Sequence, residues 1–132
     1  MNSQKSLKAY TSVDRHSGAE GEDTHAMITA LFVELLRRMR SFSQNMAGDE
    51  EVIQARNESY AKSLAILHAL QSCLDFDNGG EIAENLFRLY ELARQQLLAS
   101  LRTGEAERVE AAIHSLSEIR DAWNSMDRAD AI

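Results

Sequence analysis

Apolar residues recur at intervals of three and four in four long stretches of the chain, and this spacing limits the fold more than any other feature. Residues at such intervals lie on one face of an α-helix, and that face must be buried against another element. The sequence contains no proline, so the strongest helix breaker is missing. We therefore expect long amphipathic helices.

The first two stretches predict helices before residue 75. The first apolar stripe consists of Ile28, Phe32, Leu35, Met39, Phe42 and Met46. Asp23 or Thr24 is suited to cap the N-terminus of this helix, and Gly48 to end it in a left-handed conformation. A second helix is expected from Asp49. Its inward face is formed by Ser63, Leu67, Leu70 and Leu74.

A polar break from Asp75 to Gly80 separates these helices from the third. Asn78 and Glu81 have the spacing of a capping box, so the third helix is expected to begin near Gly80 and to end between Arg102 and Gly104. Its stripe contains Ile82, Leu86, Leu89, Ala93 and Leu97. The fourth helix follows Glu105 and Glu107, with a stripe of Val109, Ala112, Leu116, Ile119, Trp123 and Met126.

Four helices of roughly 20 residues with short connections must pack as antiparallel neighbours. The predicted fold is all-α, an antiparallel up-down-up-down four-helix bundle with a flexible N-terminal arm. We assign residues 24–127 to the bundle, residues 1–23 to the arm and residues 128–132 to a disordered C-terminal tail. The arm offers few apolar side chains, among them Tyr10 and Val13.

Composition excludes several classes of function. The 132 residues suffice for one domain, and their net charge of −7 repels phosphate backbones, so no nucleic-acid binding is expected. No apolar run approaches the roughly 20 residues that cross a bilayer, so no membrane insertion is expected. A single cysteine, Cys73, and an N-terminus without the apolar run of a secretory signal favour a cytoplasmic protein.

Motifs for catalysis or metal binding are weak. Glu22 and His25 have the Glu-x-x-His spacing, but they lie outside the apolar stripe, so we expect no metal centre, no cofactor and no enzyme. His68 and His114 are each followed two positions later by a leucine, as in histidine phosphotransfer bundles. The lysine and glycine that come next in such domains are missing here. A histidine phosphotransfer-like signalling domain therefore remains one alternative function.

Two further features suggest interaction surfaces. Several helices carry more apolar positions than a bundle core needs, which is typical of a binding protein but also of a broad core or a homodimer face. A helical adaptor that self-associates through these faces is therefore a second alternative. The basic trio Arg37, Arg38 and Arg40 is either a solvated face near a helix C-terminus or a contact for an acidic partner.

Three groups of residues carry a resemblance to a known family. They are Ala9-Tyr10 with Val13; Leu74-Asp75 leading through Gly79-Gly80-Glu81-Ile82-Ala83 and Asn85-Leu86 to Leu89-Tyr90; and Ala122-Trp123. In these positions the chain resembles the flagellar export chaperones of the FliS type. It departs from the family pattern at Asp23-Thr24-His25, where Ser-Pro is frequent, and at Val33-Glu34, where Asp-Gly is frequent.

The resemblance implies a four-helix chaperone in the bacterial cytosol, a monomer or weak homodimer. It implies that the client is the C-terminal segment of flagellin, which is disordered in the monomer and helical in the filament. Components of the flagellar export apparatus are further expected partners.

Surplus apolar positions on the second and third helices suggest where such a client binds. The expected partner-binding groove is lined by Ile66, Leu70, Ile82, Leu86, Tyr90 and Leu97. The same residues would also serve as ordinary core. Tyr10 and Val13 are expected to rest in the vacant groove and to be displaced by flagellin.

Overall fold

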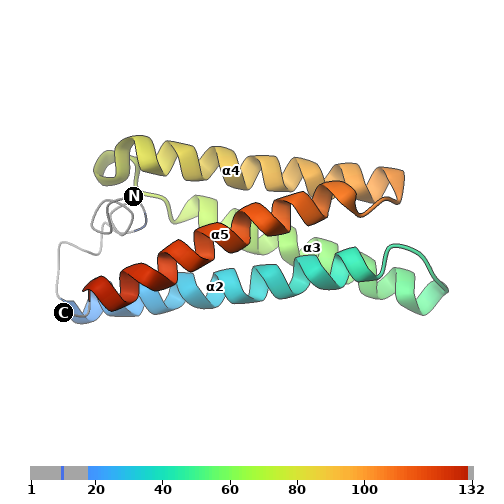
Figure 1. Ribbon diagram of the computed structural model, residues 1–132, viewed down its shortest axis with the longest axis horizontal. Helices are drawn as coiled ribbons and strands as arrows, with labels where there is room; N and C mark the ends of the chain where they lie inside the picture. The colour runs from blue at the N-terminus through green and yellow to red at the C-terminus, as the bar shows by residue number, and fades with distance from the viewer. Residues whose placement is uncertain (1–9, 11–17, 131–132) are drawn as a thin grey trace.

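The computed structural model describes Tyr10 and residues 18–130, with side chains at Tyr10 and at residues 23–125. Within these residues the protein consists of four helices and contains no strand (Figure 1). The helices are α2 (Gly18–Gln44), α3 (Glu50–Ser72), α4 (Phe76–Thr103) and α5 (Glu107–Asp130). The predicted all-α, four-helix fold is therefore confirmed.

Consecutive helices are antiparallel neighbours because only short loops join them, at residues 45–49, 73–75 and 104–106. α2 also packs along α5, which closes the bundle and leaves α2 and α4 at opposite corners. Side-chain contacts give the relative direction of α2 and α5. Arg40 meets Ser117 and Ser43 meets Glu110, so one helix ascends as the other descends.

The predicted stripes form one continuous core. Fully buried side chains come from all four helices: Ile28, Phe32, Leu35, Leu36, Met39, Phe42, Leu67, Leu70, Ala83, Tyr90, Leu97, Val109 and Leu116. Full burial of one Leu, Ile, Phe or Met side chain stabilises the fold by about 1.5–3 kcal/mol. Each stripe is buried only by the other helices, so the four helices depend on one another for stability.

The ends of α2 differ from the expected ones. The helix begins at Gly18, before the expected caps Asp23 and Thr24. It ends at Gln44, before Gly48. Here the Asn45 side-chain amide donates a hydrogen bond of 2.7 Å to the Ser41 carbonyl and closes the last turn without glycine. α5 extends to Asp130, beyond the expected limit at residue 127.

The expected start of α3 is confirmed. Asp49 is its N-cap, and its carboxylate accepts a hydrogen bond of 3.0 Å from the Val52 backbone N–H. Glu50 and Glu51 follow in the first turn, where negative charge is favourable.

α4 begins with a turn that the capping-box interpretation missed. The N-cap is Asp75 and not Asn78, because the Asp75 carboxylate accepts hydrogen bonds from both the backbone N–H and the side-chain amide of Asn78, at 3.1 and 2.8 Å. Gly80 then interrupts the helix with φ 51° and ψ −127°. A short turn at 76–79 therefore precedes the regular helix that the sequence placed near Gly80.

The corner between α4 and α5 lies where the sequence predicted the end of the third helix. Gly104 adopts the left-handed conformation, with φ 75°, and its N–H donates to the Ser100 carbonyl at 2.9 Å. The buried Ser100 hydroxyl accepts a hydrogen bond of 3.2 Å from the Val109 backbone N–H. One serine thus joins the end of α4 to the first turn of α5.

α2 and α3 meet through small polar side chains as well as apolar ones. The buried Ser59 hydroxyl donates to the Ser41 hydroxyl at 3.0 Å. One turn further along α3, the fully buried Ser63 hydroxyl has no hydrogen-bond partner among the described residues. The two serines therefore differ in what their hydroxyl groups contribute to stability.

None of the described helices has an apolar stretch long enough to span a bilayer.

Replacing Gly80 with alanine is expected to lower the free energy of unfolding by about 1–3 kcal/mol, because an L-residue is strained at its φ and ψ. Gly104→Ala is the matched control and should cost less, about 1 kcal/mol, since its left-handed conformation is milder. A Cβ would have open space at both positions, so steric clash does not enter. Urea denaturation measures both values, and a Gly80→Ala protein as stable as the parent would contradict the kink.

Ser63→Ala and Ser59→Ala are expected to change stability in opposite directions. Ser63→Ala removes a buried, unpaired hydroxyl and should leave the protein equally stable or more stable by up to about 1 kcal/mol. Ser59→Ala removes a hydrogen bond to Ser41 and should cost about 0.5–1.5 kcal/mol. Thermal unfolding of both variants provides the comparison. A clear loss of stability for Ser63→Ala would show that its hydroxyl is paired.

Candidate partner-binding site

Tyr10, from the N-terminal part of the chain, is bound by the helical bundle. Its side chain is only 5% exposed, and its hydroxyl group forms a hydrogen bond with that of Tyr90 on α4. Its ring meets Trp123 of α5 edge to face, with centroids 5.6 Å apart and planes at 81°. Such aromatic pairs contribute about 0.5–1.5 kcal/mol beyond the burial of their area. We call the surface formed by Tyr90 and Trp123 the tyrosine seat.

The two tyrosines at this seat are both neutral. Burial raises the pKa of the Tyr90 hydroxyl, and burial followed by the neighbouring Tyr90 raises the pKa of Tyr10. Because both pKa values are raised, the contribution of the two neutral hydroxyl groups to the stability of the fold is complete below the ordinary tyrosine pKa. This contribution is lost only at strongly alkaline pH. The contact between the N-terminal segment and the bundle therefore does not respond to pH in the physiological range.

Trp123 is held in place by α2. The ring of His25 stacks on it, with centroids 4.5 Å apart and planes within 5°. The His25 Nε2–H donates to the Trp123 carbonyl at 3.2 Å, since that oxygen can only accept. The Trp123 Nε1–H donates to the Thr29 hydroxyl at 2.9 Å, and that hydroxyl donates to the His25 carbonyl at 2.8 Å. The seat is thus rigid before any partner arrives.

Residues far apart in the sequence meet at this seat. Tyr10, Tyr90 and Trp123 each belong to one of the three groups that carried the family resemblance, and the structure brings them into contact. Sequence reasoning gave Trp123 only a core position and did not connect it with Tyr10. Val13, the second residue expected in the arm, lies outside the described residues.

The six residues of the expected groove lie on α3 and α4, which pack against each other. Leu70, Tyr90 and Leu97 are fully buried, and Leu86 is 6% exposed. Ile66 and Ile82 are partly buried and pack against the core from its edge. With Tyr10 bound, four of the six groove residues are therefore buried, and the other two are only partly buried.

Other apolar side chains of α4 are more exposed than those six. Phe76 is 47% exposed, Phe87 40% and Leu92 49%. The rings of Phe76 and Phe87 contact each other across the kink at Gly80, with centroids 6.0 Å apart. Phe87 and Leu92 are apolar positions in excess of the central stripe, and sequence reasoning did not assign them to the site. Helical periodicity could have done so, since both fall off the central stripe.

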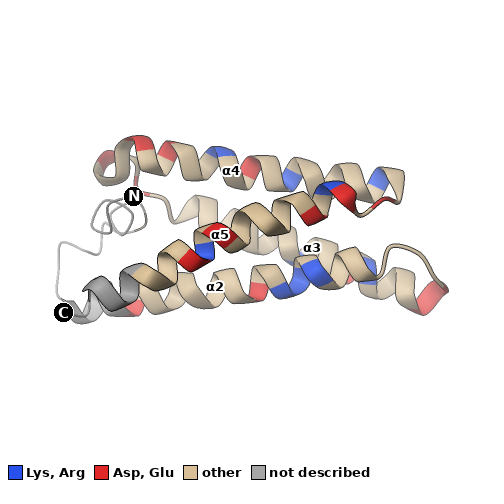
Figure 2. Ribbon diagram, in the orientation of Figure 1, with Lys and Arg blue, Asp and Glu red and all other residues tan. Residues whose placement is uncertain are grey.

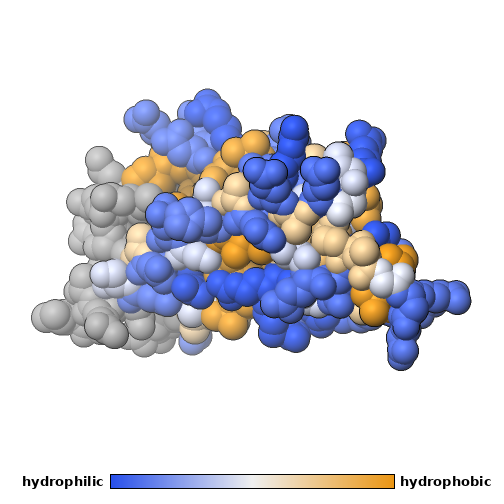
Figure 3. All heavy atoms as spheres, turned by 45° about the vertical axis from the view of Figure 1, so that its right-hand side comes forward, coloured by the Kyte–Doolittle hydropathy of each residue, from blue (hydrophilic) through white to orange (hydrophobic). Residues whose placement is uncertain are grey.

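Apolar surface is visible between the charged side chains of the molecule. Figure 3 shows orange areas interrupted by blue side chains, one of them beside the grey atoms. A polar cluster borders the exposed aromatic pair: the Gln71 amide donates to the Phe87 carbonyl at 3.4 Å and to the Glu91 carboxylate at 3.1 Å, and its oxygen accepts from Arg94 at 2.6 Å. This cluster ties α3 to α4 beneath the aromatic pair.

The titratable side chains of the described residues suggest no reactive centre. No three of the His, Cys, Asp and Glu side chains in this part of the chain gather closely enough to hold a metal ion. His114 is exposed, and its Nε2 lies 3.4 Å from the Glu118 carboxylate, a negative charge that would repel a phosphoryl group. His68 is exposed beside the Ser72 hydroxyl, at 3.4 Å.

Comparisons with known proteins agree on one family. The family model described as flagellar protein FliS matches residues 6–130. A flagellar secretion chaperone FliS from Salmonella typhimurium is 32% identical and aligns over 96% of this chain and 93% of its own. Its counterpart from Vibrio cholerae is 27% identical, over 92% and 88%, and the flagellar secretion chaperone FliSB of Pseudomonas aeruginosa is 25% identical, over 96% and 98%.

The matched region contains all four helices and the tyrosine seat, so the similarity extends over the whole described fold. The family is one of chaperones and not of enzymes. With a family model spanning nearly its full length, the chain belongs to the FliS family of flagellar secretion chaperones.

Proposed function

We propose that this protein binds the disordered C-terminal segment of flagellin in the bacterial cytosol, prevents its premature polymerisation and keeps it competent for export. The observation that carries the proposal is the tyrosine seat. Tyr10, from the chain's own N-terminal segment, is bound there against Tyr90 of α4 and Trp123 of α5. A surface that binds one peptide segment through a side chain is suited to exchange it for another.

The geometry supports an exchange with a longer client. Tyr10 covers the Tyr90 hydroxyl and the edge of Trp123, so its departure would expose both. Ile66 and Ile82 already lie at the margin of the core, and Phe76 and Phe87 are exposed nearby on α4. An amphipathic helix from the client would place its apolar positions along this row, the mode in which helices bind apolar grooves.

The energetics of such binding favour reversible holding. A disordered segment that folds on binding typically buries roughly 1,000–3,000 Å² and gives back about 2–5 kcal/mol or more in ordering cost. Displacing the N-terminal segment adds a further cost, because only those molecules in which Tyr10 has left the site can bind the client there. Both terms lower the affinity and make release at the export apparatus easier.

Covering the C-terminal segment also accounts for the prevention of polymerisation. That segment is helical in the flagellar filament, so flagellin molecules whose segments lie on the chaperone have no free partner with which to assemble. The proposed place of action is the cytosol, since export-competent flagellin must be held before it is exported. The export apparatus is the proposed second partner.

Ile82→Glu is expected to weaken binding of the flagellin C-terminal segment by roughly 5- to 150-fold, because one well-packed apolar contact at an interface is worth about 1–3 kcal/mol. Phe87→Ala should act in the same direction without disturbing the core, since that side chain is 40% exposed. Val33→Glu is the control, because Val33 is 52% exposed on α2, at the opposite corner from α4.

Calorimetry with a synthetic flagellin C-terminal peptide measures the affinity, and circular dichroism verifies that each variant is folded. If folded Ile82→Glu and Phe87→Ala proteins bound the peptide as tightly as the parent does, the client would lie elsewhere on the molecule.

Deleting residues 1–15 is expected to increase the fluorescence of a dye that binds exposed apolar surface, because Tyr10 no longer covers the tyrosine seat. Tyr10→Phe should give a smaller increase, since the ring contact with Trp123 remains while the Tyr90 hydroxyl loses its partner. Adding the flagellin peptide should reverse the increase in both proteins. Unchanged dye fluorescence after the deletion would argue against a covering role for the N-terminal segment.

A further inference from the structure

Three arginines of the described helices lie close together on α2. Residues 35–48 contain three arginines and no acidic residue, in a chain whose net charge is −7. Figure 2 shows this cluster on α2. α3 packs antiparallel along α2 and places Lys62 beside the cluster. We call the surface of Arg37, Arg38, Arg40 and Lys62 the basic face.

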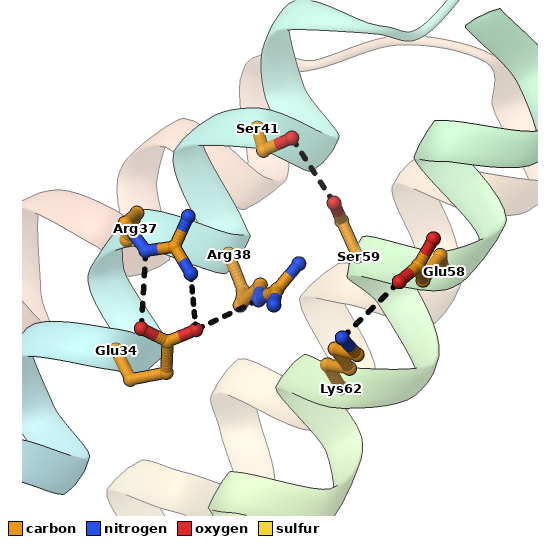
Figure 4. A network of polar contacts seen from close by, with 7 residues as sticks. All are labelled: Glu34, Arg37, Arg38, Ser41, Glu58, Ser59 and Lys62. Carbon is orange, nitrogen blue, oxygen red and sulfur yellow. Dashed lines mark hydrogen bonds and ion pairs between the residues drawn. The ribbon is translucent and has the colours of Figure 1, made fainter.

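Side chains of the basic face already bind a carboxylate of their own chain. The Glu34 carboxylate accepts two hydrogen bonds from Arg37, at 3.0 and 2.6 Å, and one from Arg38 at 2.8 Å. The hydrogen bond from Arg37, followed by that from Arg38, lowers the pKa of Glu34. In Figure 4, Arg38 points from α2 towards α3, where Lys62 pairs with Glu58 at 3.1 Å. The arginines are thus arranged to bind carboxylates.

The internal pairing leaves positive charge unbalanced. One carboxylate serves both Arg37 and Arg38, and the side chain of Arg37 is still 62% exposed. Arg40 is exposed as well, and its contact is the uncharged Ser117 hydroxyl at 3.4 Å. A solvated surface with balanced charges would need no partner, whereas the basic face has a clear excess of positive charge.

An exposed apolar side chain adjoins the charges. Val33 precedes Arg37 by four residues, so both lie on the same face of α2, and Val33 is 52% exposed. Met27, earlier on the same helix, is 47% exposed. The partner that fits has acidic side chains next to apolar ones, as an acidic amphipathic helix does.

The basic face is separate from the proposed client site. Tyr10 lies near Trp123, which contacts Thr29 of α2, and Arg40 follows Thr29 by about 16 Å along the helix axis. α4, which carries most of the proposed client contacts, occupies the opposite corner of the bundle from α2. A client on α4 therefore leaves the basic face accessible.

We propose that the basic face binds an acidic amphipathic helix of a second protein, at a site distinct from the one that holds the client. Nucleic acid, the other common polyanion, is disfavoured by the negative charge of the chain as a whole. A second copy of this chain is the remaining candidate, because acidic residues are frequent on α5. The test is designed to separate these three occupants.

The probe is a short fluorescent helical peptide with glutamates next to leucines, compared with the same peptide carrying glutamine in place of glutamate. Anisotropy titration of the full chain should show that the glutamate peptide binds more tightly, and that its affinity falls as salt rises. The Arg37→Gln/Arg40→Gln double variant should weaken binding about two- to thirtyfold, since two exposed charge pairs are lost. Glu34→Gln should tighten binding, because it releases two guanidinium groups.

The Arg102→Gln/Arg108→Gln variant is the matched control, with the same change of charge at two exposed positions beside the α4–α5 corner. Phe87→Ala should also leave the affinity for the peptide unchanged. The proposal is overturned if either variant weakens binding as much as the basic-face variant does. Equal binding of the glutamine peptide, or tighter binding of a single-stranded oligonucleotide, would overturn it as well. Light scattering completes the test, because self-association that Arg37→Gln/Arg40→Gln abolishes would identify a second copy as the occupant.

Discussion

Mutual burial of four apolar stripes is the constraint on which the rest of this structure depends. Most of the stability of a helix in a protein comes from the packing of its apolar face, and the four stripes here are buried in one common core. Core formation therefore requires all four helices at once. The flanks of the helices are left outside this arrangement, and exposed apolar side chains such as Val33, Phe87 and Leu92 lie there.

The tyrosine seat brings together Tyr10, Tyr90 and Trp123, which all belong to the buried core cluster. Trp123 is pinned from α2 by His25 and Thr29, so the surface that Tyr10 meets has a fixed shape. The hydrogen bond between Tyr10 and Tyr90 satisfies two hydroxyl groups that burial would otherwise leave costly. A client that displaces Tyr10 must replace both the apolar cover and this hydrogen bond. In the proposed exchange, the client would therefore place an apolar side chain and a hydrogen-bonding group near Tyr90.

The two proposed surfaces differ in their physical character and in their place on the bundle. The client surface is apolar and aromatic, and lies mainly on α4, whereas the basic face is charged and lies on α2 and α3. Apolar contacts favour holding a partner, while exposed charges mainly influence how quickly and how selectively a partner arrives. A chaperone that holds one protein and then meets another has use for both kinds of surface.

Much of the fold could be predicted because helix formation and burial follow local patterns. The stripes identified the core residues from Ile28 to Trp123, and Asp49 and Gly104 marked helix ends through hydrogen bonds within a few residues. The first turn of α4 was missed because Asp75 and Asn78 compete for the same capping role, and only the observed hydrogen bonds distinguish them. The early end of α2 was missed for a similar reason, since Asn45 closed the helix in place of Gly48.

The site was predictable only in part. Spacing placed six candidate groove residues on the second and third helices and also assigned Leu70 and Leu97 to the apolar stripes, but it could not decide between groove and core or tell that Phe76 and Phe87 are exposed. That distinction depends on how neighbouring helices rotate about their axes as they pack, and this rotation is set by contacts among all four.

The amino-acid sequence alone determined that the chain forms four amphipathic helices, because apolar residues that recur at intervals of three and four positions line one face of an α-helix. Its charge and composition also determined which classes of partner are disfavoured. The tertiary structure alone decided that Tyr10, Tyr90 and Trp123 meet. Contacts between residues about 80 or more positions apart depend on helix packing, which no local pattern encodes.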